Sequence, residues 1–228
     1  MPTVLAFALG GSCRARVSVA VLSMSAMNDD MSAHIDRMAV EAIDLMVDAV
    51  SEVPQGSWNS PSNLEAWSVG ELVAHATGSA TKVVTLVEGG ELWGGPSLPS
   101  DWTYDDPAGR LLELSVRLRQ ALPAVDLDAL RVSPEGEVPL RRALMYPVSD
   151  LALHSWDVRR SLGRSVELPD DLLGLCEGLV ESLPEAMLRR PGAFGPAQPA
   201  PADSSRTSRL LAFLGRSVGD NCGAQPTP

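Results

Sequence analysis

VPLRRALMYPVSDLALHSWDVRRSLG, residues 138–163, is the stretch that decides the fold, and it carries two candidate site residues. It predicts one long helix in which Asp150 and His154 stand four residues apart. Side chains at this spacing share a helical face, with Cβ atoms about 5–6 Å apart, so both can reach one cation. Pro147 predicts a kink or a defect in the hydrogen-bond ladder about one turn before Asp150.

The third ligand of such a site must come from another element. Ser68 and Glu71 form an S-x-x-E capping box, which predicts that a helix begins at residue 68. His75 flanks the apolar stripe of this helix and is the better placed of the two remaining histidines. His34 lies off the apolar stripe of its own helix, so we expect it to be solvated.

We therefore predict a metal site formed by His75, Asp150 and His154. Spacing alone leaves two simpler interpretations open. Asp150 and His154 can be a local helix pair that adds little stability, and His75 can be a core histidine with a backbone partner. Asp157 is placed to orient a ligand imidazole, or else it is an exposed acid paired with a nearby arginine.

The rest of the chain consists of amphipathic patterns joined by segments rich in Pro and Gly. We expect helices over residues 32–53, 68–88, 107–122, 168–190 and 204–214, the fourth interrupted at Pro184. The apolar set of the helix at 107–122 is Leu111, Leu112, Val116, Leu118 and Leu122. Residues 126–137 are polar and irregular, with room for a short extended segment. Four substantial helices and one long connection predict an up-and-down bundle with a crossover.

We divide the chain into three parts. Residues 1–31 are expected to be a disordered or mis-started extension, residues 32–218 the helical bundle with its C-terminal segment, and residues 219–228 a disordered tail. The extension has apolar runs, but no Lys or Arg precedes the first of them, which disfavours a secretory signal.

The composition excludes several classes of function. Lys and Arg number 18 against 29 Asp and Glu, a net charge of −11, which disfavours nucleic acid as a partner. No run of about 18 apolar residues is present, so we expect no membrane span. Cys13, Cys176 and Cys222 are odd in number and widely spaced, which disfavours disulfides and a CxxC zinc site and makes a reducing cytoplasm the expected location. Cys176 is expected in the core.

Three stretches carry a resemblance to a known family. They are AWSVGELVAHATG at 66–78, SDLALHSWDVRRSLGR at 149–164 and FGPAQPAPADSSRTSRLLAFLGR at 194–216. They resemble the DinB-like metal-binding superfamily, and more closely its branch named for mycothiol-dependent maleylpyruvate isomerase. The resemblance extends from about residue 35 to residue 216, and the H-S-W-D and F-L-G-R segments are its most specific parts.

The resemblance implies an all-α fold, a four-helix up-down-down-up bundle with a long crossover and a short C-terminal helix. It implies that three side chains hold a divalent metal, and by position these are His75, Asp150 and His154. Many relatives have Glu or His where Asp150 stands, and the shorter Asp reaches less far. Three protein ligands leave a coordination position open, and zinc is the implied metal, with nickel or iron as alternatives.

The resemblance further implies mycothiol or a related low-molecular-weight thiol as cosubstrate. A metal-coordinated thiol is deprotonated at neutral pH and attacks electrophiles, so we expect a thiol-dependent transferase or isomerase with an electrophilic small-molecule substrate. The isomerases themselves carry an additional C-terminal domain, so isomerase activity is not assumed for this chain.

Other interpretations of the chain remain. A non-catalytic, stress-related metal-binding module is the alternative, and a metal-free bundle is a third. The resemblance also implies a homodimer. Arg206, Arg209 and Arg216 are expected to be solvated on a helix face, with binding of a thiol or substrate carboxylate as the alternative.

Overall fold

The structure is a computed structural model, and it describes residues 34–64, 66–91, 97–133, 136–189 and 193–219. The predicted extension at 1–31 and all but the first residue of the predicted tail lie outside the described residues. Cys13 and Cys222 lie outside them as well.

Helices dominate the described chain, as the sequence predicts. The long ones are α2 (Ile35–Ser51), α3 (Val69–Val87), α4 (Pro107–Ala121) and α5 (Leu140–Ser161). The shorter ones are α6 (Asp170–Ser182), α7 (Glu185–Leu188) and α8 (Arg206–Phe213). Within the described residues, no helix has the length and apolar character needed to span a membrane.

Local sequence signals set where these helices begin. Ser68 caps α3: its side chain accepts from the N–H of Glu71, and the Glu71 side chain accepts from the N–H of Ser68. Asp106 caps α4, with Pro107 in the first turn, where a missing N–H costs nothing. α5 continues through Pro147, which removes one donor from its ladder without ending it.

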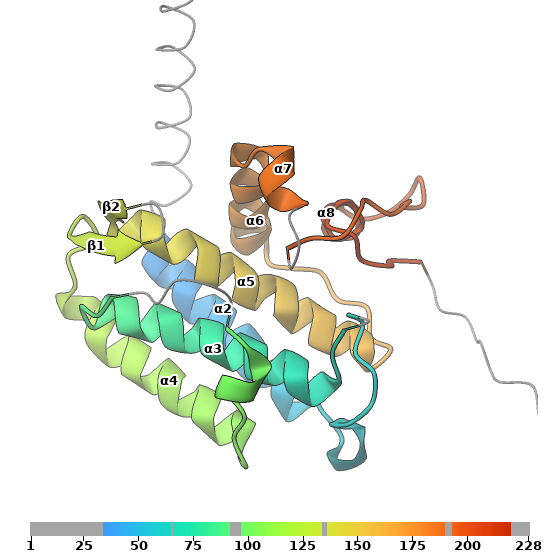
Figure 1. The fold of residues 1–228 in the computed structure, drawn as a ribbon, viewed down its shortest axis with the longest axis horizontal. Coiled ribbons are helices and arrows are strands. Elements are labelled where there is room, and N and C mark those ends of the chain that lie inside the picture. The colour runs from blue at the N-terminus through green and yellow to red at the C-terminus, as the bar shows by residue number, and fades with distance from the viewer. Residues whose placement is uncertain (1–33, 65, 92–96, 134–135, 190–192, 220–228) are drawn as a thin grey trace, which may run out of the picture.

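The bundle is built around α5 (Figure 1). α5 packs most extensively against α2 and α3, and α4 packs against both of those helices. Large apolar side chains fill the space between the four helices, among them Ile43, Met46, Leu72, Leu111, Leu114, Leu118, Leu144 and Leu151. Their burial fixes how α3 and α5 face each other, which positions the candidate site.

Contacts between helix ends give the helix directions. Arg159 near the end of α5 lies 3.6 Å from Glu52, which follows α2, so these two helices run the same way. Arg117 near the end of α4 pairs with Glu88 at the end of α3, so α3 and α4 run together. The loop before α3 is bonded to the last turns of α5, so α3 is antiparallel to α5.

The buried face of α4 differs from the prediction. Leu112 and Val116 are 55% and 47% exposed, whereas Leu114 and Ser115 are buried. This helix carries apolar residues on more than one face, so its own pattern does not select a single inner face. The positions of α2 and α3 select the face that includes Leu111, Leu114 and Leu118.

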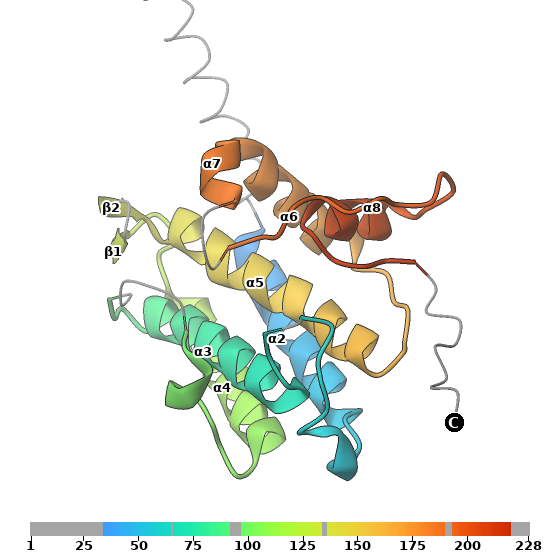
Figure 2. The same cartoon turned by 45° about the vertical axis from the view of Figure 1, so that its right-hand side comes forward.

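The C-terminal helices lie on the side of α5 that faces away from α3 and α4 (Figures 1 and 2). α6 contacts both α5 and α2. A small hairpin departs from a purely helical fold: β1 (Leu130–Ser133) pairs antiparallel with β2 (Gly136–Pro139) just before α5. The predicted helix at 168–190 is divided at Pro184 into α6 and α7, as expected from that proline.

Candidate metal centre

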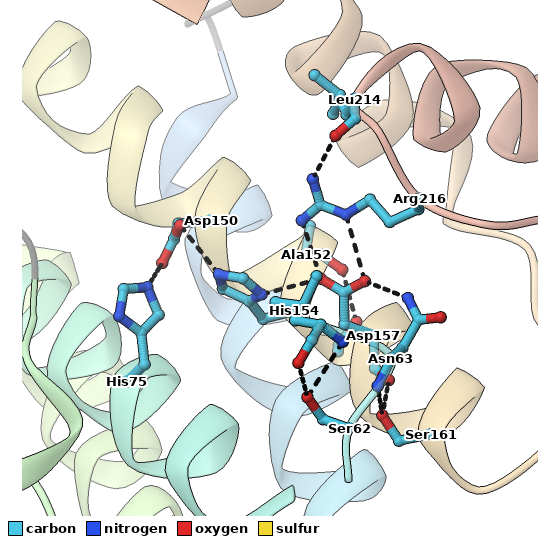
Figure 3. A network of polar contacts seen from close by, with 12 residues as sticks. Ser62, Asn63, His75, Asp150, Ala152, His154, Asp157, Ser161, Leu214 and Arg216 are labelled. Carbon is cyan, nitrogen blue, oxygen red and sulfur yellow. Dashed lines mark hydrogen bonds and ion pairs between the residues drawn. The ribbon is translucent and has the colours of Figure 1, made fainter. Parts of the chain in front are cut away.

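α3 and α5 bring His75, Asp150 and His154 together (Figure 3). Nε2 of His75 lies 3.3 Å from Oδ2 of Asp150, and Nε2 of His154 lies 3.4 Å from Oδ1 of the same carboxylate. One potential ligand atom from each residue lies within 4.8 Å of the other two. Both imidazoles are buried, whereas the Asp150 side chain is 35% exposed, so the group is accessible at its carboxylate.

The main chain fixes the ring of His75. Its Nδ1 lies 2.6 Å from the carbonyl oxygen of Ser97. A carbonyl oxygen can only accept, so Nδ1 carries the proton and Nε2 faces Asp150. Ser97 approaches α3 closely because Gly78 has no side chain: a Cβ there would lie 2.4 Å from Cβ of Ser97. His75 therefore has the backbone partner of the simpler interpretation and still directs Nε2 at the cluster.

A buried carboxylate fixes the ring of His154. Nδ1 of His154 lies 3.0 Å from Oδ2 of the fully buried Asp157. Arg216 donates to both oxygens of Asp157, at 3.3 and 2.9 Å, and Asn63 donates to one at 3.1 Å. Burial alone would raise the pKa of Asp157, but the charge of Arg216 and the His154 hydrogen bond hold this pKa well below its usual range. Asp157 is thus a buried, ionised acceptor, and the exposed-acid interpretation is wrong.

Asp150 and His154 shift each other's protonation. Burial alone would lower the pKa of His154, but the charge of Asp150 and the hydrogen bonds to Asp150 and Asp157 raise it to about 9. Burial would likewise raise the pKa of Asp150, but His154 and His75 hold that pKa well below its usual range. A proton on His154 therefore balances the Asp150 carboxylate, and a cation bound to Nε2 would replace that proton.

Ser79 holds the carboxylate of Asp150 in place. It lies four residues after His75, on the same face of α3, and its Oγ donates to Oδ2 of Asp150 at 2.6 Å. Although Asp is shorter than Glu, each oxygen of Asp150 faces one imidazole. The carboxylate of Asp150 therefore reaches both imidazoles despite its shorter side chain.

The indole of Trp67 lies beside both imidazoles. Its ring centroid is 4.7 Å from that of His75 and 6.3 Å from that of His154, and the two imidazole rings are nearly perpendicular. Trp67 belongs to the loop before α3, in which the N–H of Asn63 donates to Oγ of Ser161 at 2.7 Å. The loop thus places an aromatic side chain against the candidate site.

These residues fit a divalent cation. Two imidazoles and a carboxylate are a donor set that catalytic zinc and non-haem iron both use. Both Nδ1 atoms are engaged by oxygen acceptors, the usual arrangement at metal-binding histidines. Two ligand atoms about 2.1 Å from a tetrahedral ion lie about 3.4 Å apart. The two nitrogen–oxygen separations at Asp150 lie near that value, each to a different oxygen of the carboxylate.

The three C-terminal arginines were all predicted to be solvated on a helix face, and this is not true of each of them. Arg216 is 6% exposed and paired with Asp157, so the prediction that it is solvated is wrong. The chain leaves α8 through Gly215 at a φ of +89°, and this turn directs Arg216 inward. Arg206 pairs with Glu177 at the surface, and Arg209 donates to a nearby carbonyl oxygen.

The remaining candidate side chains lie where the sequence places them. His34 is exposed at the start of α2. Cys176 is buried, and burial raises the pKa of its thiol to about 12, which makes it an inert core residue.

Several residues that support the candidate site were not expected from the sequence. Ser79 had a usable signal, because it stands four residues from His75 on the same helical face. Ser97, Asn63 and Trp67 had none, because their loops reach the candidate site only after the helices have packed.

The fold and the site define a class of protein: a helical bundle that gathers two imidazoles and one carboxylate between two facing helices. The family described as "Mycothiol maleylpyruvate isomerase N-terminal domain" matches residues 39–159, more than half of the chain. The protein belongs to this family.

The chain is also similar to individual proteins and solved structures. The uncharacterized proteins MT0763 and Rv0738 of Mycobacterium tuberculosis are each 24% identical over 178 residues, covering 78% of this chain and 94% of theirs. Crystal structures of the mycothiol-dependent maleylpyruvate isomerase and of a histidine-to-alanine mutant align with a TM-score of 0.50 and 17% identity. These alignments cover 62% of this chain and 66% of the isomerase, just under two thirds, and they show a shared fold.

Proposed function

We propose that His75, Asp150 and His154 bind a divalent cation, zinc in the first instance, and that the protein is a thiol-dependent transferase or isomerase. Mycothiol or a related low-molecular-weight thiol would be the cosubstrate, and an electrophilic small molecule the substrate. The single observation that carries the proposal is the convergence of two Nε2 atoms and a carboxylate, with both Nδ1 atoms already bonded elsewhere.

The ligand count supports a reactive site over a structural one. Structural zinc sites are closed by four protein ligands, whereas catalytic sites retain a position for water or substrate. Within the described residues, His75, Asp150 and His154 form a group of three with no fourth side chain of the ligating kinds. When bound, a divalent cation would lower the pKa of a coordinated thiol and so supply a nucleophile at neutral pH.

The side chains at the site determine where a metal-bound thiol and an electrophile would bind. His75 and His154 present fixed Nε2 atoms, and Ser79 holds the carboxylate of Asp150 between them. Trp67 lies beside both imidazoles, and the carboxylate of Asp150 is the exposed part of the group. The cytoplasm expected from the cysteine pattern would keep such a thiol reduced.

The full-length protein tests this proposal in two measurements. Elemental analysis after purification should give about one divalent ion per chain, and His154→Ala should lose it. His34→Ala is the matched control, because His34 is exposed at the start of α2 and should leave the metal content unchanged. Equal metal content in wild type and His154→Ala would refute the site.

The second measurement separates enzyme from binding module. Mycothiol and chlorodinitrobenzene are mixed with the metal-loaded protein, and formation of the thioether is followed by absorbance. Turnover that requires both metal and thiol supports the transferase. Metal uptake without thiol binding or turnover would instead support the non-catalytic module.

A further inference from the structure

The F-L-G-R segment at residues 213–216 has no part in the proposed ligand set, yet one of its side chains reaches that set. Arg216 donates to both carboxylate oxygens of Asp157, and Asp157 accepts from Nδ1 of His154 (Figure 3). All three side chains are buried. Arg216 lies beyond residues 39–159, so this chain of contacts joins the C-terminal segment to a ligand of the family domain.

The turn after α8 is built to deliver Arg216. Gly215 has a φ of +89°, and a Cβ there would lie 2.9 Å from backbone atoms of Gly195. Two backbone segments therefore touch at this point, and only glycine permits both the conformation and the contact. The guanidinium of Arg216 then lies over the ring of Phe194, 5.3 Å from its centroid, and faces Asp157.

Another arginine already holds this segment to the protein. Arg189 donates to the carbonyl oxygens of Gly195 and Phe213, and its guanidinium lies over the Phe213 ring. Arg216 makes two hydrogen bonds to Asp157 and one, at 3.3 Å, to the Leu214 carbonyl oxygen. The contacts of Arg216 are thus directed at the site more than at the segment itself.

We propose that Arg216 is a positioning residue for His154, and we call residues 213–216 the C-terminal clamp. Arg216 donates to both oxygens of Asp157 and so holds this carboxylate against Nδ1 of His154, which fixes the rotation of the imidazole. Nε2 then stays directed at Asp150. Without Arg216 the buried carboxylate would lack its charged partner, and it would move away from this position. The inference rests on the proposed metal site for its functional meaning, but the positioning exists without metal.

Zinc affinity of the full-length chain, measured by competition with a chromogenic chelator, tests the clamp. Arg216→Met should weaken binding about tenfold or more, the effect expected when the partner of a ligating histidine is lost. Arg216→Lys should recover part of this loss. Arg206→Met is the matched control: it removes an α8 arginine whose partner is Glu177 at the surface, and it should bind zinc as the wild type does. Wild-type affinity in Arg216→Met would overturn the proposal.

The double variant Asp157→Asn, Arg216→Met covers the case in which Arg216→Met does not fold. Arg216→Met alone would leave the buried Asp157 carboxylate without a charged partner. The double variant removes both charges, so this cause of misfolding is absent. Because both residues act through one hydrogen bond, the double variant should bind zinc no more weakly than Asp157→Asn alone. Additive losses would overturn the proposal.

A measurement on metal-free protein distinguishes failure of the clamp from failure of the metal site. The Nδ1 proton of His154 should be visible by NMR as a slowly exchanging, hydrogen-bonded proton in the wild type and in Arg206→Met. It should be lost in Arg216→Met, or exchange faster than in the wild type in Arg216→Lys if only that variant folds. Exchange at the wild-type rate there would refute the clamp even if zinc binds, and loss or faster exchange would support the clamp even if the wild type binds no zinc.

Discussion

A methyl group added at Gly78 should damage the site, although helix propensity alone predicts the opposite. Replacing a mid-helix glycine by alanine ordinarily stabilises by about 0.5–1 kcal/mol. In Gly78→Ala, however, the new Cβ would lie 2.4 Å from Cβ of Ser97, 2.6 Å from its Oγ and 2.8 Å from Cδ1 of Trp102. Normal carbon contacts are about 3.5–4.0 Å, so Ser97 must move by roughly 1 Å.

That movement has a calculable consequence. The bond from Nδ1 of His75 to the Ser97 carbonyl is 2.6 Å long. A shift of about 1 Å would take it to about 3.6 Å, beyond hydrogen-bond range. Overpacking costs roughly 1–3 kcal/mol and the lost bond roughly 0.5–1.5 kcal/mol, so the net loss of stability after the gain in propensity is roughly 1–3 kcal/mol. Zinc affinity should also fall, by about tenfold, because the ring of His75 loses its orientation.

Urea denaturation of the metal-free protein and chelator competition measure the two effects. Gly174→Ala in α6 is the matched control, because the nearest atom to its added Cβ is a flexible Arg206 nitrogen at 3.9 Å. This control should gain about 0.5–1 kcal/mol and keep its zinc affinity. If Gly78→Ala is as stable as Gly174→Ala and binds zinc normally, the reasoning about Ser97 and His75 is wrong.

Three further predictions concern the same region. The raised pKa of His154, about 9, means that its contribution to the stability of the metal-free protein is complete below pH 6.5 and is lost as pH rises through 9. That contribution is roughly 3 kcal/mol, and it should be absent from the pH profile of His154→Gln; identical profiles would contradict it. Ser79→Ala should weaken zinc binding several-fold by freeing Asp150, with Ser100→Ala, an exposed serine, as the control; equal affinities would exclude a role for Ser79. Cys176 should react with a thiol reagent only at the rate of unfolding, since it is buried with a pKa of about 12, and rapid labelling of the folded protein would contradict this.

Local signals in the sequence predicted much of the fold. The capping box at Ser68 and Glu71 gave the start of α3, and the long helix expected at 138–163 is α5 (Leu140–Ser161). Spacing placed Asp150 and His154 on one face of that helix, where the structure has them. These predictions succeeded because capping and i, i+4 geometry depend only on residues a few positions apart.

The prediction was wrong where a side chain's surroundings come from distant segments. Leu112 and Val116 look like core residues in the pattern of α4, yet both are exposed, because α2 and α3 pack on another face. Arg216 follows an amphipathic helix and looks solvated, yet the turn at Gly215 carries it to Asp157, 59 residues away in the chain.

The sequence by itself determined the helices, the order in which they occur and the three candidate ligand side chains. Only the tertiary structure decided that His75 meets the Asp150–His154 pair and that Ser97 and Asp157 orient the two rings. The physical reason is the separation along the chain between the groups that interact. Backbone hydrogen bonds, caps and helical faces are set within one or two turns, whereas the direction of an imidazole depends on partners that only packing brings within 3 Å.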